Sequence, residues 1–297
     1  MGLGADPDTR PLITTALVEQ LIDTQFPQWA ALPLVPYGPA GSDHVIHRLG
    51  DALTVRLPRH QDAVGQGAKE SVWLPRLAPR LPLAVPVPVA LGAPDLGYPW
   101  PWSVTRWLDG EVATVAALGE STGAATELAR FLKALHRVPA ETGHPDLPGW
   151  SLRDRDRATR AAIADVSGAF DRTARTAMTA LWDAALAAPG WDRPPVWFHG
   201  DFHTGNLLTS AGRLSAVIDF GGLGVGDPAC DLMVAFTLLS ATGRAAFRTE
   251  LGVDGATWTR GRGWALATGL NAYTAYAEHD PRVAAQTTRQ ITAALAG

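Results

Sequence analysis

The feature that most constrains this chain is a short polar segment, HGDFHTGN, which runs from His199 to Asn206 and is followed downstream by DFGG, beginning at Asp219. The apolar segments between them flank a glycine, which predicts a small β-hairpin. Such a hairpin would return the side-chain oxygens of Asn206 and Asp219 to one cleft. Magnesium prefers hard oxygen ligands of this kind and retains water besides. The pattern therefore predicts a site where a magnesium-nucleotide and a hydroxyl-bearing substrate meet.

Asp201 lies within this segment, and its carboxylate is suited to orient a hydroxyl group and accept its proton. Phosphoryl transfer asks little more of a protein than this alignment and the neutralisation of phosphate charge. In the alternative interpretation, Asp201 and Asn206 only cap turns and Asp219 only begins a β-turn. The joint match of both segments at this spacing favours the catalytic interpretation.

The composition narrows the class of protein. The chain has 297 residues, of which 46% are hydrophobic and 18% charged, and its net charge of −4 does not support general nucleic-acid binding. Its single cysteine, Cys230, excludes an intrachain disulfide and a multi-cysteine zinc site, and a buried, inert thiol is expected. No apolar run approaches the roughly 20 residues of a membrane helix, and the N-terminus lacks a secretory pattern, so a cytoplasmic location is expected.

The pattern of elements predicts an α+β protein with two lobes. Residues 1–106 contain short strand patterns, including VIHRLGDALTVRLP with a tight turn at Gly50, and are expected to form the nucleotide-binding lobe. Residues 107–297 are mainly helical in pattern and are expected to carry the catalytic and substrate-binding groups. One helix is predicted at the start of the first lobe, from Thr14 to Gln25, and the proline-studded LPLAVPVPVALG segment is expected to be a linker or an edge strand.

Three segments, HGDFHTGNLL, VIDFGG and GDPACDL, together resemble the aminoglycoside phosphotransferase family, which shares the protein-kinase-like fold. The resemblance covers residues from about 40 to about 235 and fades towards both ends. It implies a small antiparallel-sheet lobe, a larger helical lobe and magnesium-dependent transfer of phosphate. It also implies that Asp201 is the catalytic aspartate, that Asn206 and Asp219 are the metal ligands, and that His199 supports the loop.

The first lobe departs from the kinase pattern at one position. Arg56, in LTVRLPR, lies where kinases carry a phosphate-binding lysine, and Glu70 matches its partner. Arginine keeps the charge and adds a planar set of donors, so phosphate binding is expected to survive. In the alternative, Arg56 is a strand arginine on a solvated face. Ser42 is expected in a loop over the phosphates, and Ser103 and Thr105 in a connector that contacts the nucleotide base.

The stretch after DFGG is too short to seat a peptide, and it lacks the A-P-E sequence that ends the activation segment of protein kinases. A small-molecule hydroxyl is therefore the expected acceptor. Asp227 and Asp231 are expected to be structural, with Asp231 capping or bracing the catalytic loop. Tyr273, Tyr276 and Trp264 are expected to be core residues, and the alternative is that they line an apolar acceptor pocket.

The expected reaction is transfer of the γ-phosphate of ATP, or of GTP as an alternative donor, to a hydroxyl of an aminoglycoside or another antibiotic, with Mg²⁺ as cofactor. One alternative is a metabolic kinase for choline, homoserine or a sugar amine, which would need only a different pocket. Another is a nucleotide-binding pseudo-enzyme, which Arg56 leaves open.

Overall fold

The computed structural model describes residues 11–38 and 43–297, so Ser42 lies outside the described residues. The chain forms two compact units. The smaller comprises Met1–Pro79, Ala84–Asp109 and Val217–Gly221, and the larger comprises Arg80–Leu83, Gly110–Ala216 and Gly222–Gly297. The predicted α+β class is confirmed, because a five-stranded antiparallel sheet dominates the smaller unit and helices dominate the larger. The predicted lobe boundary after residue 106 stays a prediction.

The sheet of the smaller unit has the strand order β1-β2-β3-β5-β4, with every neighbour antiparallel. The strands are β1 (Leu34–Tyr37), β2 (His44–Leu49), β3 (Leu53–Pro58), β4 (Pro88–Gly92) and β5 (Trp102–Arg106). The predicted tight turn joins β2 to β3, where Gly50 has a φ of 56°. The proline-studded segment supplies β4 at an edge of the sheet, where a missing N–H group breaks no pairing with a further strand.

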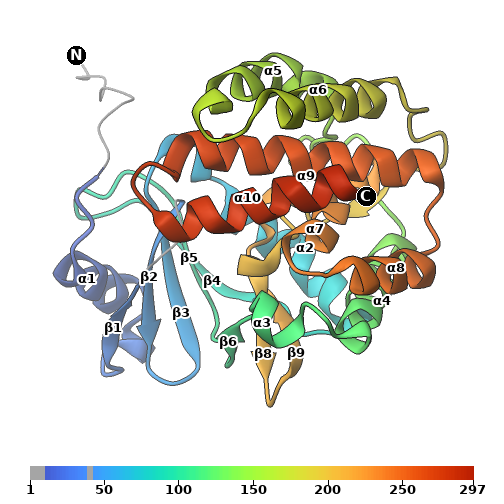
Figure 1. The fold of residues 1–297 in the computed structure, drawn as a ribbon. Helices are drawn as coiled ribbons and strands as arrows, with labels where there is room; N and C mark the ends of the chain where they lie inside the picture. Colours follow the sequence, from blue (N-terminus) through green and yellow to red (C-terminus); the bar gives the residue numbers. More distant parts are fainter. Residues whose placement is uncertain (1–10, 39–42) are drawn as a thin grey trace. The chain divides into compact units, whose positions relative to one another are not determined.

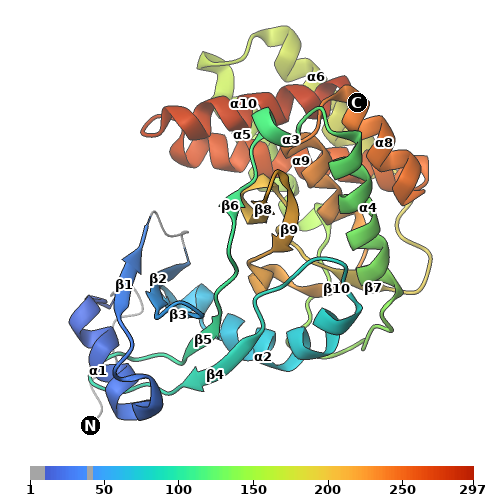
Figure 2. The same ribbon diagram turned by 90° about the horizontal axis from the view of Figure 1, so that it is seen from below.

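The two faces of this sheet differ in character because side chains alternate along each strand. Val55 and Val104 point to an apolar face that packs against α1 (Thr15–Gln25), whose predicted bounds are confirmed within one residue. The other face carries Arg56 and Ser103 and receives α2 (Gln66–Leu77) (Figure 2). The fold therefore places Arg56 and Ser103 between the sheet and α2.

The larger unit is built on eight described helices. They are α3 (Val115–Leu118), α4 (Thr122–Arg137), α5 (Asp156–Asp165), α6 (Arg172–Ala187), α7 (Val234–Thr237), α8 (Ala241–Leu251), α9 (Gly255–Tyr276) and α10 (Pro281–Ala296). Helix α10 packs beside α9, and α5 and α6 lie along α9 on its other side (Figure 1). No helix in the described part of the chain is long and apolar enough to cross a membrane. A cytoplasmic location stays a prediction.

Short strands hold the predicted signature segments. They are β6 (Glu111–Val112), β7 (Val196–Phe198), β8 (Leu207–Ser210), β9 (Arg213–Val217) and β10 (Gly224–Gly226). The predicted hairpin is confirmed: β8 pairs with β9 through a turn at Ala211 and Gly212, both with positive φ. Strand β7 pairs with β10, so the chain enters and leaves the two signature segments through paired strands. Cys230 is buried, as expected, and burial raises the pKa of its thiol.

Candidate active site

The HGDFHTGN loop follows β7 and is held by packing on both sides. Phe202 is fully buried and stacks on Phe131 of α4 with ring centroids 5.6 Å apart. Gly200 has a φ of 88°, and a Cβ atom there would lie only 2.2 Å from the main-chain oxygen of Gly222. A side chain at position 200 is therefore excluded both by backbone conformation and by contact. His199 is buried, and its Nδ1 accepts a hydrogen bond from the Asp201 amide at 3.2 Å.

Asp231 holds the main chain of this loop through hydrogen bonds, as the sequence predicted. Its two carboxylate oxygens accept hydrogen bonds from the amides of His199, at 2.7 Å, and Gly200, at 2.8 Å. Burial raises the pKa of Asp231 to about 7, although the two amides oppose this shift. Asp227 caps the following turn and pairs with Arg260 at 2.7 Å, so it is structural too.

Asp201 presents its carboxylate partly to solvent, with 48% of the side chain exposed. The Asn206 Nδ2 group donates to the carboxylate at 2.9 Å, and His203 Nε2 lies 3.4 Å from the same oxygen. Burial alone would raise the pKa of Asp201. The hydrogen bond and charge of His203, with His199 and Asn206, outweigh burial and lower it to about 2. The carboxylate is thus ionised at neutral pH and oriented for a proton or hydroxyl.

The catalytic interpretation of this loop stays a prediction, and so does the turn-capping alternative. His203 caps the turn at Thr204–Asn206 through its Nδ1, which accepts from the Gly205 amide at 3.0 Å. The Asn206 side chain instead donates to the main-chain and carboxylate oxygens of Asp201. Since its nitrogen is occupied, the amide oxygen of Asn206 is the atom that could bind a cation. The sequence pattern did not indicate His203 as a partner of Asp201, because a contact between residues two positions apart depends on the conformation of the turn between them.

In the smaller unit, Arg56 is buried and pairs with Glu70 at 2.6 Å, so the solvated-face alternative for Arg56 is wrong. Its other guanidinium nitrogen lies 3.8 Å from the Asp219 carboxylate. Burial would lower the pKa of Arg56, but Glu70 and Asp219 raise it, so the guanidinium group stays protonated. Burial raises the pKa of Glu70, and Arg56 opposes that shift. The predicted phosphate-binding pair is therefore assembled beside the predicted metal ligand Asp219.

Asp219 has a φ of 64°, a left-handed conformation that is rare outside glycine. Its side chain is 44% exposed. Two positions on, the main-chain oxygen of Gly221 accepts a hydrogen bond from Lys69 Nζ of α2 at 2.5 Å. The lysine next to Glu70 thus ties the DFGG segment to α2. No sequence motif marks Lys69, because the contact joins residues far apart in the chain.

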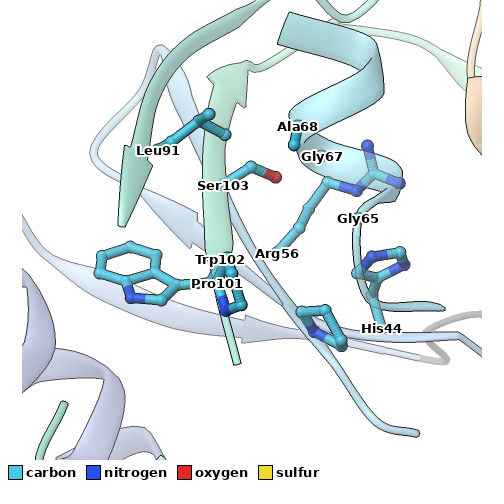
Figure 3. A pocket seen from close by; sticks show the side chains of 10 residues that line it. His44, Arg56, Gly65, Gly67, Ala68, Leu91, Pro101, Trp102 and Ser103 are labelled. Carbon is cyan, nitrogen blue, oxygen red and sulfur yellow. The ribbon is translucent and has the colours of Figure 1, made fainter. Parts of the chain in front are cut away.

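A narrow slot of about 10 Å³ lies between β3, β5 and the start of α2 (Figure 3). Arg56, Ser103 and His44 border it, and burial and then the Arg56 charge lower the pKa of His44 to about 3. This volume holds about one water molecule. Ser103 and Thr105 lie in β5, whose main chain pairs on both sides within the sheet. Their predicted contact with a nucleotide stays a prediction.

The donor chemistry fits a magnesium ion carried by a nucleotide. The half-exposed carboxylate of Asp219 and the carboxamide oxygen of Asn206 are each a hard oxygen ligand of the kind that magnesium prefers. Within the described residues, no group of three or more histidine, cysteine or acidic side chains is placed to hold a metal by itself. Asp219 belongs to the smaller unit and Asn206 to the larger.

Trp264, Tyr273 and Tyr276, the three aromatic residues of the alternative acceptor pocket, differ in burial. Trp264 is buried, as expected of a core residue, and its ring lies 5.9 Å from that of Trp150. Tyr273 packs against Phe170, and Tyr276 is exposed, so the expectation that Tyr276 is a core residue is wrong. Its position at the end of α9 leaves it outside the packed face of that helix.

The sequence is similar to those of known phosphotransferases and kinases. The model of the phosphotransferase enzyme family matches residues 38–264. An aminoglycoside 3'-phosphotransferase of Escherichia coli is 29% identical over 150 residues, which are 46% of this chain and 52% of that protein. A glucosamine kinase of Streptacidiphilus jiangxiensis is 33% identical over 134 residues, 41% of this chain and 29% of that protein. The matches thus span about half, or less, of these relatives.

Solved structures are similar over nearly the whole chain. An aminoglycoside 2''-phosphotransferase in complex with GDP and kanamycin has a TM-score of 0.75 at 20% identity, covering 94% of this chain and 98% of that one. A macrolide 2'-phosphotransferase of Brachybacterium faecium has a TM-score of 0.61 at 25% identity, covering 94% and 97%. These likenesses confirm the fold that the resemblance implied.

Proposed function

This chain belongs to the phosphotransferase enzyme family, and we propose that it transfers the γ-phosphate of a nucleotide to a hydroxyl of a small molecule. The observation that carries this proposal is the state of Asp201. Its carboxylate has a pKa lowered to about 2, is partly exposed, and is oriented by Asn206 on a loop that Asp231 braces. Such a group orients the acceptor hydroxyl and takes its proton as the bond to phosphorus forms.

The nucleotide is ATP in this proposal, with GTP as an alternative. Solved relatives hold GDP, ADP and ATP. Arg56, fixed by Glu70, would bind phosphate oxygens, and Asn206 and Asp219 would each give one oxygen to Mg²⁺. The ion supplies charge neutralisation on the transferred phosphate. The ion pair of Arg56 with Glu70 argues against the pseudo-enzyme alternative, because the position retains a buried, oriented cation.

The proposed acceptor is an aminoglycoside or another hydroxylated antibiotic, which would make the chain a resistance enzyme. One solved relative binds kanamycin, and one curated relative is an aminoglycoside 3'-phosphotransferase. A second candidate is an amino sugar, favoured by the 33% identity with a glucosamine kinase. Both acceptor classes are sugars that carry amines, so a common pocket chemistry would serve either. A choline or homoserine kinase has no comparable observation in its favour.

The test is magnesium-dependent ADP release with a panel of aminoglycosides, macrolides and amino sugars. We expect turnover with one class, and we expect Asp201→Asn to lose it while nucleotide binding persists. Asp165→Asn, an exposed carboxylate on α5, is the matched control and should keep full activity. Nucleotide binding without turnover on any acceptor would favour the pseudo-enzyme, and full turnover by Asp201→Asn would remove Asp201 from its role.

A further inference from the structure

An open groove runs between α5 and α6, two helices of the larger unit that pack against each other and against α9. Its volume is about 440 Å³, within the roughly 300–1,000 Å³ of small-molecule sites in proteins. In Figure 1, α5 and α6 lie on one side of α9 and β8 lies on the other. The described residues that line the groove all belong to α5 or α6, so it is separate from the candidate active site. We call it the α5–α6 groove.

Three arginines line the α5–α6 groove, and none of the described lining residues is acidic. Arg160 comes from α5, and Arg172 and Arg175 come from α6. The two arginines of α6 lie in its first turn, where the aligned peptide dipoles carry partial positive charge and favour carboxylates. Cations at these positions do not stabilise the helix. Helix formation therefore does not account for them.

Arg160 already has acidic partners, which are not lining residues. Its Nε atom donates to Asp156 Oδ1 and its Nη2 atom to Asp183 Oδ1, each at 2.7 Å. Because Asp156 lies on α5 and Asp183 on α6, these bonds join the two helices and fix the guanidinium group. Trp182 Nε1 donates to the same oxygen of Asp156 at 2.7 Å. The charge of Arg160 is therefore compensated, and its Nη1 atom is left for a further ligand.

Arg172 and Arg175 have no such partners. Among the described residues, no carboxylate forms an ion pair with either side chain. The neighbouring acid, Asp171, caps α6 instead, and its carboxylate accepts a hydrogen bond from the Ala174 amide at 2.7 Å. The Nε atom of Arg175 is buried and has no hydrogen-bond partner, which costs free energy. The groove thus carries two guanidinium groups that lack an ion-pair partner.

The remaining lining is mixed in character. The Thr176 hydroxyl donates to the Arg172 main-chain oxygen at 2.9 Å, and the Thr179 hydroxyl donates to that of Arg175 at 3.0 Å. Since both hydroxyl hydrogens are used within the helix, the two oxygens can only accept hydrogen bonds from a ligand. Ile163 adds apolar surface. A ligand in the groove would therefore meet guanidinium donors, hydroxyl acceptors and an apolar side chain.

We propose that the α5–α6 groove binds a small organic phosphate, a phosphate monoester whose hydroxylated body has about the size of a monosaccharide. A phosphate monoester carries about −1.5 to −2 charges near neutral pH, which matches Arg172 and Arg175 together. A single carboxylate would match only one of them. Guanidinium groups bind phosphate oxygens with paired donors. The groove is much larger than a phosphate ion, and the oxygens of Thr176 and Thr179 can accept from the hydroxyl groups of the attached body.

The probe is glucose 6-phosphate, and its binding is measured by calorimetry without nucleotide, at constant ionic strength set with chloride. We expect saturable binding at one site, several-fold tighter than that of inorganic phosphate and absent for glucose. Arg172→Gln and Arg175→Gln should each weaken this binding about tenfold or more, since charge-assisted hydrogen bonds are lost. Arg175→Lys should recover only part of the affinity, because it keeps the charge without the paired donors. Phosphoryl transfer plays no part in this measurement, so its outcome is independent of the function proposed above.

Arg157→Gln is the matched control, because Arg157 is an exposed arginine of α5 that does not line the groove. Its affinity for glucose 6-phosphate should equal that of the wild type. The proposal is overturned if Arg172→Gln and Arg175→Gln bind as tightly as the wild type, or if Arg157→Gln weakens binding as much as they do. Absence of binding at millimolar glucose 6-phosphate would overturn it too. Equally tight binding of inorganic phosphate would show that the groove does not recognise an organic body, which also contradicts the proposal.

Discussion

Asn206 donates two hydrogen bonds from Nδ2 to Asp201, one to the main-chain oxygen and one to the carboxylate, each at 2.9 Å. One side chain thereby fixes both the backbone turn and the orientation of the proposed base. The same arrangement turns the amide oxygen of Asn206 away from these contacts. The position therefore combines the side chain that holds Asp201 with the proposed metal ligand, and a carboxylate or hydroxyl of similar size would not provide both.

Replacing Asn206 should separate these roles. Asn206→Ala removes the support and the proposed ligand, and we expect kcat to fall about 10- to 100-fold, as for other residues that orient a functional group. Asn206→Asp keeps an oxygen ligand but places a like charge against Asp201, which raises the pKa of that carboxyl. Its kcat should therefore recover as pH rises, whereas Asn206→Ala should not. Steady-state kinetics between pH 5 and 9 would measure this recovery of kcat. Parallel pH profiles of kcat for the two variants would contradict the prediction.

Asp231 should make stability depend on pH in a definite direction. Its folded-state pKa is raised from 3.8 to about 7, so the folded state binds more protons than the unfolded state between these values. The stabilisation from protonated Asp231 is complete below about pH 4 and is lost as pH rises through about 7. The difference in Tm between wild type and Asp231→Asn should shrink over that range. A difference that grows with pH would show that the two amides dominate instead.

Local patterns carried most of what the sequence could predict. The turn at Gly50 and the helix α1 each follow from spacing within one segment. The contacts that the sequence missed join distant segments or depend on a particular turn. His44 shares a strand face with Arg56 only once the register of β2 and β3 is known, and Lys69 meets Gly221 only in the folded unit.

Arg56 and Glu70 should be coupled in stability but not in function. Arg56→Gln leaves Glu70 as a fully buried, unpaired acid, and breaking such a pair costs about 3–5 kcal/mol. The double variant Arg56→Gln, Glu70→Gln removes both charges, so it should regain much of the free energy of unfolding. Its nucleotide affinity should stay low, because the phosphate-binding cation is gone. Chemical denaturation and nucleotide titration of all three variants would measure this, and restored nucleotide affinity in the double variant would argue against Arg56 as a phosphate ligand.

Lys69 should control how the DFGG segment is held. Its ammonium donates to the Gly221 oxygen at 2.5 Å, two residues beyond Asp219, whose left-handed backbone needs outside support. Lys69→Met should therefore raise the Mg²⁺ concentration required for nucleotide binding several-fold and increase hydrogen exchange at residues 219–222 in the nucleotide-free protein. Lys69→Arg should restore part of both. Lys133→Met, which removes the other lysine of the chain from its pair with Glu250, is the control. If both lysine variants weaken magnesium-nucleotide binding equally, the effect comes from lost charge, and the link from α2 to DFGG has no part in positioning Asp219.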